Sequence, residues 1–311
     1  MITGGAGFIG RALLGHLSDY RITIFDNFSR GLAQDGLPKA DIIKGDIRNS
    51  DALAKACADT DAVIHLAAFG SVVESMADPT INFEINARGT FNILNACREQ
   101  GVQRIILAST GGALIGDAEP PVDETSLPKP ISPYGASKLC GEAYGSTFAQ
   151  AFSLPTVALR FANIYGPYSA HKKGVITTFF KAIMRNEPLP IVGDGSSTRD
   201  YLYVDDLCRG IKRALGADIA AGEIFHLASG TETSIHELAA TICEVAGVPD
   251  HTVRFLDKRP GEVERNFATF DKARAQLGFE PRWALRDGLE KTWQWFQANR
   301  TFVLSTDESD S

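Results

Sequence analysis

The sequence predicts an α/β fold built on a doubly wound parallel sheet, and three observations support this prediction. The first half of the chain alternates apolar, β-rich runs with helical patterns, the order typical of parallel strands joined by helices. A turn with a glycine at every third position stands at Gly4, Gly7 and Gly10, almost at the first residue. Expected strands end in an acid or a hydroxyl residue, at the sheet edge where such folds bind their ligands.

The first expected unit is a strand, a glycine turn, a helix and a second strand over 22–25 that ends at Asp26. Only Met1 and Ile2 precede the turn, whereas a strand has about five residues. We therefore expect a shortened first strand and weaker cofactor binding, either because the strand is cut short or because its start is placed late. Glycines let the backbone approach a pyrophosphate, the helix start offers free N–H groups, and the acid accepts hydrogen bonds from a ribose.

This unit predicts a dinucleotide site. The carboxylate of Asp26 favours NAD over NADP, because a 2′-phosphate would meet a negative charge. A glycine-rich turn without a ligand is the simpler alternative, and the spacing of Asp26 after the helix argues against it.

The following elements continue the alternation. Strands are expected at 40–46, 62–68, 105–109 and 156–161, and helices at 50–58, 82–100 and 133–151. After Gly166 and Pro167 the pattern changes, with helices expected near 175–186, 234–246 and 286–298 and a strand near 253–255. A strand at 223–228 is expected to rejoin the large sheet. The expected organisation is a cofactor-binding domain over 1–166, a smaller, partly interleaved α/β substrate domain over 167–300, and a flexible acidic tail over 301–311.

The composition excludes several classes of function. The chain has 311 residues, 22% of them charged, a net charge of −7 and a pI of about 5.4, which disfavour a nucleic-acid or anionic-membrane partner. No apolar run is long enough to cross a membrane, and no charged leader precedes a hydrophobic segment. Five scattered cysteines without a CxxC pair predict a cytoplasmic protein with reduced thiols. The six histidines show no metal-ligand spacing, and His65 and His226 are interpreted as satisfied structural residues.

Tyr134 and Lys138 form a second motif, Tyr-Gly-Ala-Ser-Lys. Residues four apart share one face of a helix, and a cation beside a phenol favours the phenolate. We therefore expect the pKa of Tyr134 to fall from about 10 toward neutrality, so that Tyr134 acts as a general base, while Lys138 also holds the nicotinamide ribose. Thr110, at the end of an expected strand, lies where its hydroxyl can reach a substrate oxygen. A chance meeting of a surface tyrosine and lysine is the alternative.

Nine runs of sequence together resemble the extended short-chain dehydrogenase/reductase superfamily, and within it the NAD-dependent nucleotide-sugar epimerases and dehydratases, UDP-glucose 4-epimerases most of all. The resemblance extends from Thr3 to about Phe296 and rests on residues 3–10, 25–27, 45–48, 65–68, 109–112, 134–138, 163–167, 198–206 and 259–262. It implies a Rossmann domain that binds NAD, followed by a nucleotide-sugar-binding domain.

The resemblance also implies a role for each matching residue. NAD would be bound by Gly4, Gly7, Phe8, Ile9 and Gly10 at its pyrophosphate, by Asp26 and Asn27 at its ribose, by Asp46 and Ile47 at its adenine, and by Leu66, Ala67, Ala68, Asn86, Tyr134 and Lys138 toward its nicotinamide. The catalytic residues would be Thr110, Tyr134 and Lys138, and the substrate would be held by Asn163, Arg199, Arg259 and Glu262. The two arginines would clamp a diphosphate. A salt bridge to Asp200 or Asp205 is the alternative for Arg199.

The implied reaction inverts C4 of a UDP-hexose, UDP-glucose or UDP-galactose, through a 4-keto intermediate, with NAD retained by the protein. Epimerases of UDP-N-acetylhexosamines or UDP-uronic acids remain alternatives, because Asn266 stands where side-chain bulk gates N-acetylated sugars and is neither the largest nor the smallest option. A nucleotide-sugar dehydratase would need an Asp-Glu pair after Thr110, where Gly111 and Gly112 stand.

Two further expectations concern assembly and activity. The resemblance implies a homodimer in which the helices at 82–100 and 133–151 pair with their copies in a four-helix bundle. A cofactor-binding protein with a relict site is the non-enzyme alternative. The short first strand keeps that alternative open, and the intact Thr110, Tyr134 and Lys138 argue against it.

Overall fold

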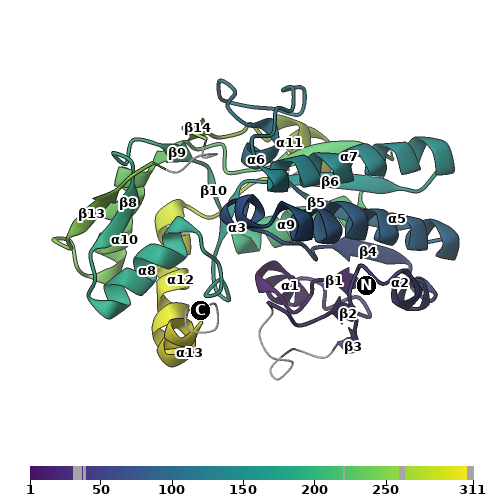
Figure 1. The fold of residues 1–311 in the computed structure, drawn as a ribbon, viewed down its shortest axis with the longest axis horizontal. Helices are drawn as coiled ribbons and strands as arrows, with labels where there is room; N and C mark the ends of the chain where they lie inside the picture. The colour runs from purple at the N-terminus through teal and green to yellow at the C-terminus, as the bar shows by residue number, and fades with distance from the viewer. Residues whose placement is uncertain (31–36, 38–39, 220, 259–262, 307–311) are drawn as a thin grey trace.

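The computed structural model describes residues 1–30, 37, 40–219, 221–258 and 263–306. Its larger part is a seven-stranded sheet in which all neighbours run parallel, in the order β11-β6-β5-β4-β1-β2-β3 (Figure 1). The strands are β1 (Ile2–Thr3), β2 (Thr23–Asp26), β3 (Asp41–Lys44), β4 (Ala62–His65), β5 (Arg104–Thr110), β6 (Thr156–Phe161) and β11 (Glu223–Leu227). This arrangement confirms the predicted doubly wound α/β fold.

Helices cover both faces of this sheet. One face carries α2 (Ser50–Cys57), α5 (Gly89–Gln100) and α7 (Pro133–Phe152), and the other carries α1 (Phe8–Leu14) and α9 (Val204–Gly216). Neighbouring residues of one strand enter different cores, since Ile24 packs with the α1 side and Phe25 with the α2 and α5 side. A sheet buried on both faces requires such continuous apolar strands.

The first strand is as short as the sequence predicts. Residues Ile2 and Thr3 pair with β2 on one side and with β4 on the other, and the amino-terminal ammonium of Met1 donates to the carbonyl oxygen of Ala62 at 2.7 Å. The strand order changes direction at β1, because β2 lies on one side of it and β4 on the other. Ligands of open α/β sheets bind at the carboxyl ends of the strands beside such a switch point.

The helix expected over 82–100 consists of three pieces. It begins with α4 (Pro79–Asn82), passes through a π-helical segment, η1 (Phe83–Arg88), and continues as α5. Short π-helical turns occur frequently at functional sites, where they direct a side chain that a regular helix would not. Here the π-helical turn carries Asn86.

A smaller lobe lies on the left in Figure 1. Its helices are α8 (Val175–Arg185), α10 (Ile235–Ala246), α12 (Leu285–Ala298) and α13 (Arg300–Ser305), and its two-stranded sheet joins β8 (Leu189–Val192) with β13 (Val253–Leu256). The remaining elements are β7 (Asn163–Tyr165) paired with β10 (Tyr201–Tyr203), the sheet of β12 (Thr233–Ser234), β9 (Thr198–Arg199) and β14 (Arg265–Asn266), and the helices α3 (Val72–Ala77), α6 (Gly112–Ile115) and α11 (Asp271–Leu277).

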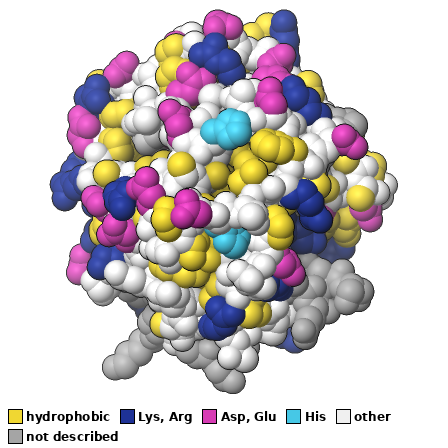
Figure 2. Space-filling view, turned by 90° about the vertical axis from the view of Figure 1, so that its left-hand side faces the viewer, with side chains coloured by type: hydrophobic (Ala, Val, Ile, Leu, Met, Phe, Trp, Pro, Cys, Tyr) yellow, Lys and Arg dark blue, Asp and Glu magenta, His cyan; other side chains and the backbone are white. Residues whose placement is uncertain are grey.

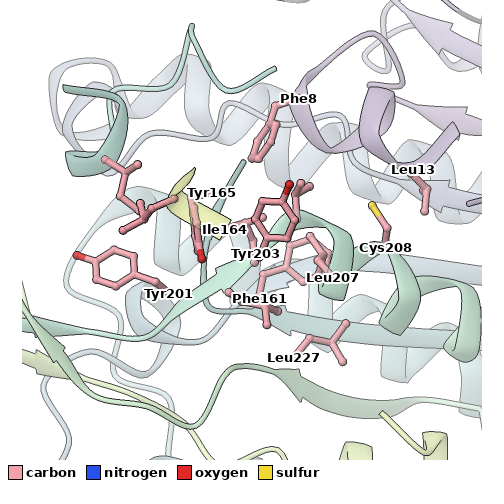
Figure 3. Close-up of a cluster of buried hydrophobic side chains, with 14 of the residues drawn as sticks. Phe8, Leu13, Phe161, Ile164, Tyr165, Tyr201, Tyr203, Leu207, Cys208 and Leu227 are labelled. Carbon is pink, nitrogen blue, oxygen red and sulfur yellow. The ribbon is translucent and has the colours of Figure 1, made fainter. Parts of the chain in front are cut away.

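The two lobes share one core. After residue 167 the chain returns to the large sheet twice, with α9, which packs on β5 and β6, and with β11, which extends the sheet beside β6. The sequence predicted only the second return. Side chains from α1, β7, β10 and α9 meet in a single apolar cluster, in which Phe8, Tyr165, Tyr203 and Leu207 lie close together (Figure 3). This shared core fixes the position of the small lobe beside the carboxyl ends of the strands.

The expectation of a flexible tail from residue 301 is wrong for its first part. Residues 300–305 form α13, and Val303 is fully buried. The hydroxyl of Thr306 donates to the carbonyl oxygen of Ala170 at 3.1 Å, which fastens the end of this helix to the small lobe. The apolar run 302–304 explains the packing, while residues 307–311 lie outside the described part of the chain.

The outer face of the small lobe carries acidic and basic side chains interspersed with apolar ones (Figure 2). All five cysteines are free thiols, four of them buried. Among the described residues, no helix has the length and apolar character that crossing a membrane demands.

Candidate active site

The glycine turn is packed so closely that side chains are excluded at two of its positions. Gly4 has a φ of +68°, and a Cβ there would lie 2.6 Å from the backbone nitrogen of Ala67. A Cβ at Gly10 would lie 2.5 Å from the carbonyl oxygen of Gly5. Gly7 is the N-cap of α1, whose first N–H groups have no acceptor within the helix. The turn thus presents bare backbone donors, as a pyrophosphate requires.

Two residues predicted at the pyrophosphate can contribute mainly through their backbone. Phe8 is buried in the shared core, with the ammonium of Lys172 5.3 Å from its ring centroid. Ile9 is half-buried and packs against the same core. Their amides belong to the first turn of α1, where they remain available to a ligand.

Asp26 lies at the tip of β2 and holds the glycine turn in place. One carboxylate oxygen accepts from the backbone N–H of Ala6 at 3.0 Å, and the other accepts from Phe28 at 2.8 Å. A carboxylate has about four acceptor positions, so this group retains capacity for ribose hydroxyls. The arrangement fits the role predicted for Asp26 beside an adenosine ribose.

The next acid, Asp46, is paired within the chain. Its carboxylate accepts from Arg48 Nη2 at 2.7 Å and from Asn27 Nδ2 at 3.0 Å. These donors hold the pKa of Asp46 well below its usual range, chiefly through the hydrogen bond from Arg48. Ile47 is 5% exposed and packs against Gly89 on α5. Its side chain therefore supports this edge of the site from beneath.

The loop after β4 is held at both ends. The backbone N–H of Leu66 donates to the carbonyl oxygen of Thr3, and that of Ala67 lies 3.4 Å from the Thr3 hydroxyl; Ala68 follows. Asn86 accepts from the backbone N–H of Phe69 at 2.7 Å and donates to its carbonyl oxygen at 3.1 Å. Asn86 thus fixes the loop that a nicotinamide would lie against.

The two buried histidines differ. His65 contacts the hydroxyls of Thr3 at 2.7 Å and Thr90 at 3.1 Å, and burial lowers its pKa to about 3, so it is the satisfied structural residue that the sequence predicted. His226 also has a pKa lowered to about 3 by burial, but its Nε2 has no partner among the described residues. The sequence predicted that all polar atoms of the His226 side chain have hydrogen-bond partners, and this is wrong for Nε2.

The three predicted catalytic residues come from two neighbouring elements. Thr110 ends β5, whereas Tyr134 and Lys138 lie in the first turns of α7, whose N-cap, Ser132, accepts from the backbone N–H of Gly135. The backbone N–H of Tyr134 donates to the Ser75 hydroxyl on α3 at 3.2 Å. The start of α7 is thereby fixed to the helix that follows β4.

Lys138 and Tyr134 do not interact as the sequence predicted. Lys138 Nζ donates to the carbonyl oxygen of Ala108 at 2.9 Å and lies 5.9 Å from the centroid of the Tyr134 ring. Burial raises the pKa of Tyr134 to about 12 and lowers that of Lys138 to about 8. The expected fall in the pKa of Tyr134 is therefore wrong for the protein alone, because the loss of hydration outweighs the field of a cation turned toward β5.

The alternative for Arg199, a salt bridge with Asp200 or Asp205, is wrong. Arg199 Nη1 donates to the carbonyl oxygens of Thr198 at 2.7 Å and Glu264 at 3.3 Å, and neither acid pairs with it in the described part of the chain. Asp200 is buried and accepts from Ser229 and Gly230. The rest of the guanidinium fork is available to a ligand.

A small polar cavity lies in the small lobe, and it shares one neighbour with Arg199, namely Glu264. It is lined by Val192, Gly193, Asp194, Ser197, Lys258, Val263 and Glu264. Asn163 is another of the four predicted substrate residues. It is exposed, and its Nδ2 donates to the carbonyl oxygen of Asp200 at 3.2 Å. The predicted roles of Arg259 and Glu262 fall on positions outside the described residues, although Lys258 and Val263, on either side of them, line this cavity.

Three sets of contacts near the candidate site were not predicted from the sequence. Glu142 follows Tyr134 and Lys138 on the same face of α7, a spacing of four that could have revealed it. Asn266 packs against Gly112, which no local pattern indicates. Glu74 on α3 pairs with Arg30 at 2.5 Å and with Lys173 at 3.0 Å, and so joins segments far apart in the sequence. Within the described residues, no group of histidine, cysteine and acidic side chains could hold a metal ion.

Comparison with known proteins gives consistent matches. A model of the NAD dependent epimerase/dehydratase family matches residues 1–228. A putative UDP-glucose 4-epimerase of Methanocaldococcus jannaschii is 36% identical over 306 residues, covering 96% of this chain and 98% of that protein. The crystal structure of UDP-glucose 4-epimerase from Thermotoga maritima with UDP-glucose superposes with a TM-score of 0.92 at 32% identity, covering 96% of this chain and 98% of that one. A Thermus thermophilus UDP-glucose 4-epimerase in complex with NAD superposes with a TM-score of 0.89 at 32% identity, covering 95% and 98% of the two chains.

Other similar proteins act on different sugars. A dTDP-glucose 4,6-dehydratase of Streptomyces niveus is 33% identical, covering 99% of this chain and 96% of that protein. A UDP-glucuronic acid 4-epimerase from Bacillus cereus superposes with a TM-score of 0.88 at 31% identity, covering 96% and 98% of the chains. A UDP-N-acetylglucosamine 4-epimerase from Methanobrevibacter ruminantium superposes with a TM-score of 0.89 at 31% identity, covering 96% and 97%.

Proposed function

The chain belongs to the NAD dependent epimerase/dehydratase family, and from this premise we propose that it is an enzyme that inverts C4 of a UDP-hexose, UDP-glucose or UDP-galactose. NAD is its cofactor and a nucleotide sugar its substrate. The side-chain-free turn at Gly4 and Gly10 and the acid at the tip of β2 fit this dinucleotide. When bound, NAD supplies the hydride acceptor and donor for oxidation and reduction at C4.

In the proposed reaction, Tyr134 removes the proton from the C4 hydroxyl and returns one to the C4 oxygen when the 4-keto intermediate is reduced on its other face. Thr110, at the end of β5, assists by relaying this proton. Lys138 holds the nicotinamide ribose and contributes positive charge near the phenol. A phenol with a pKa of about 12 in the protein alone needs further positive charge to act as a base at neutral pH, and an oxidised nicotinamide carries such a charge.

The turn after Thr110 is the observation that best supports an epimerase over a dehydratase. Elimination needs further acid and base groups, and the acids expected of a dehydratase would stand at positions 111 and 112. A Cβ at Gly112 would lie 2.8 Å from Oδ1 of Asn266, and a Cβ at Gly111 would lie 3.3 Å from the ring of His226. Position 112 can therefore take a side chain only if the amide of Asn266 moves. A dehydratase remains the second candidate only through overall similarity.

The free part of the Arg199 guanidinium supports the placement of the substrate diphosphate near this residue. A planar, permanently charged fork suits a diphosphate, and this side chain has no carboxylate partner among the residues described. The proposal assigns the clamp to Arg199 together with Arg259, and the contact with the uridine ribose to Glu262. An anchored diphosphate would let a 4-keto sugar turn and present its other face.

Incubation with UDP-glucose, UDP-N-acetylglucosamine and UDP-glucuronate, followed by chromatography of the products, tests the function. A mixture of UDP-glucose and UDP-galactose supports the proposal, and release of a 4-keto-6-deoxy sugar supports the dehydratase. Interconversion of only the acetylated or the uronic acid substrate would assign one of the alternative epimerases. Protein that retains NAD but converts none of the three would favour the relict site.

We also propose a homodimer formed through α5 and α7, in a cytoplasmic location. Phe91 on α5 is 39% exposed and lies edge-to-face with Tyr144 on α7 at 5.4 Å, while Phe152 at the end of α7 is 48% exposed. Exposed aromatic side chains gathered on two adjacent helices are typical of a surface that a partner covers. Cell fractionation tests the location.

A further inference from the structure

Glu142 is a buried acid in the catalytic helix that the proposed reaction does not use. It lies one turn after Lys138 and two turns after Tyr134, so the three residues share one face of α7. Its exposed fraction is 5%. A carboxylate is rarely buried to this extent unless it is paired and hydrogen-bonded, so its partners indicate its purpose.

Those partners come from two strands of the sheet. Arg160 on β6, itself 2% exposed, donates from Nε and Nη2 to the two carboxylate oxygens, both at 2.9 Å. Ser109 on β5 donates its hydroxyl to Glu142 Oε1 at 2.6 Å. A bidentate arginine fixes both the position and the plane of a carboxylate. Glu142 is therefore held rigidly between α7, β5 and β6.

The same contacts align the catalytic residues along the end of β5. Lys138 bonds to the carbonyl oxygen of Ala108, Glu142 bonds to the side chain of Ser109, and Thr110 comes next. Two consecutive residues of β5 are thus fastened to two consecutive turns of α7. Any shift of the helix along the strand would break both bonds, so the placement of Tyr134 relative to Thr110 depends on this pair.

Lys138 and Glu142 also line one small cavity, with room for about one water molecule. Its polar lining comprises His65, Thr90, Ser109, Ser137, Lys138 and Glu142. Among these side chains, the hydroxyls carry no charge, and His65 has a pKa of about 3 and is neutral at physiological pH. Tyr134, on the same helix, is neutral as well, with a pKa of about 12.

Glu142 therefore supplies the negative charge within this lining. Arg160 on β6 is not among the residues that line the cavity, and its guanidinium forms an ion pair with Glu142. Burial lowers the pKa of Lys138 to about 8, and the charge of Glu142 opposes that fall. Without this charge, more of Lys138 would be neutral at physiological pH, and a neutral amine would give the Tyr134 phenolate no support.

We propose that Glu142 is a positioning residue whose carboxylate, held by Arg160 and Ser109, keeps Lys138 protonated and fixes α7 in register with the end of β5. The proposal rests on the proposed function only in taking Lys138 as part of the catalytic machinery. Its central claim concerns the protonation of one lysine and can be measured without substrate or cofactor.

The test is a titration of Lys138 followed by NMR in protein that carries lysine labelled with carbon-13 at Cε. Lys172 has a similar pKa of about 8, so Lys138→Met and Lys172→Met assign the two signals. In Glu142→Gln the midpoint of Lys138 should fall by about one pH unit or more, while that of Lys172 stays in place. Asp206→Asn, which alters another fully buried carboxylate, is the matched control and should leave Lys138 unchanged.

A folded Glu142→Gln protein with an unaltered Lys138 midpoint would overturn the proposal. If this variant does not fold because Arg160 is left unpaired, the double variant Glu142→Leu, Arg160→Met removes both charges together and takes its place. If that protein does not fold either, the Lys138 midpoint is measured in Glu142→Asp. This substitution keeps the negative charge but shortens the side chain by one methylene, so the charge lies farther from Lys138. A Lys138 midpoint equal to that of the unchanged protein then contradicts the proposal.

The pH profile of turnover provides a second readout. In Glu142→Gln the fall of kcat at alkaline pH should move to lower pH, and in Glu142→Asp it should lie between the two, because the charge is kept but stands farther from Lys138. A loss of kcat at every pH with an unmoved alkaline limb would indicate a purely structural role and contradict the proposal. Absence of turnover in the unchanged protein refutes the proposed function alone, because the titration of Lys138 still reports on Glu142.

Discussion

Lys138 Nζ donates to the carbonyl oxygen of Ala108 at 2.9 Å, so the lysine of the Tyr-Gly-Ala-Ser-Lys motif is fastened to the neighbouring strand β5. The contact links the catalytic helix to the strand that ends in Thr110. Lys138 Nζ lies 5.9 Å from the centroid of the Tyr134 ring, and burial raises the pKa of Tyr134 to about 12 in the protein alone. In the proposed reaction, the reactive state of the site would therefore depend on charge brought by the cofactor.

Replacing Tyr134 by phenylalanine should lower turnover by about 10³-fold, because general acid–base groups contribute roughly 10²- to 10⁴-fold. The ring and its packing remain, so the NAD content of the purified protein, measured after denaturation, should not change. Tyr20→Phe, at a tyrosine 47% exposed after α1, is the control and should retain full activity. Near-normal turnover in Tyr134→Phe would remove the base from the mechanism.

Stability should depend on pH through Lys138. Its pKa is lowered to about 8 in the folded protein and is about 10.4 in an unfolded chain. Between these values the unfolded state binds more protons, so the free energy of unfolding should rise with pH, by at most about 1.4 kcal/mol per pH unit for this lysine. Well below pH 8 Lys138 is protonated in both the folded and the unfolded state, so its contribution to the free energy of unfolding does not change with pH.

Urea unfolding of the unchanged protein and of Lys138→Met at pH 7.0 and 9.0, two values chosen about one unit below and above the folded pKa, measures this slope. The variant should gain less stability on going to the higher pH. Lys172, whose pKa is also lowered to about 8 by burial, contributes equally to both proteins and cancels in the comparison. Equal slopes in the two proteins would show that Lys138 is not desolvated.

Arg199→Ala should raise KM for the UDP-sugar by about 10- to 100-fold, the loss expected when a charged hydrogen-bond donor to a diphosphate is removed. The value of kcat should fall less, and the bound NAD should be unaffected. Steady-state kinetics with a coupled assay measure both parameters. Arg21→Ala, whose side chain is 89% exposed and pairs with Asp41, is the matched control. An unchanged KM would place the diphosphate elsewhere.

Phe91→Glu combined with Tyr144→Glu should convert the proposed dimer into a monomer, because both side chains are exposed and would bring four like charges into a paired helical surface. Sedimentation equilibrium at several protein concentrations measures the change. Tyr20→Glu, equally exposed on another surface, should leave the association unchanged. A protein that is monomeric before any substitution refutes the dimer directly.

The sequence predicted those parts of the fold that local patterns encode. The glycine turn, the apolar strands and the start of α7 all follow from short-range spacing, and the structure confirms the sheet that they imply. The missed α9 was also readable, since Val204, Leu207, Cys208 and Ile211 repeat at helical intervals. The six-residue α13 is too short for a period to be recognised, so its packing could not be inferred.

The electrostatics of the candidate site could not be predicted in this way. The direction of the Lys138 side chain and the burial of Tyr134 depend on β5 and on the cavity behind α7, which come together only in the folded chain. The contact between Gly112 and Asn266 joins residues from distant parts of the sequence that meet in space.

The contact between Gly112 and Asn266 also limits how this enzyme could acquire new chemistry. A single exchange that introduces an acid at position 112 meets Asn266 at 2.8 Å and should disturb the loop before any new activity appears. Trimming Asn266 to alanine first would open the space and permit the acid afterwards. We therefore expect the two positions to be coupled, and a laboratory evolution experiment that aims at sugar dehydration should find changes at position 266 together with those at position 112.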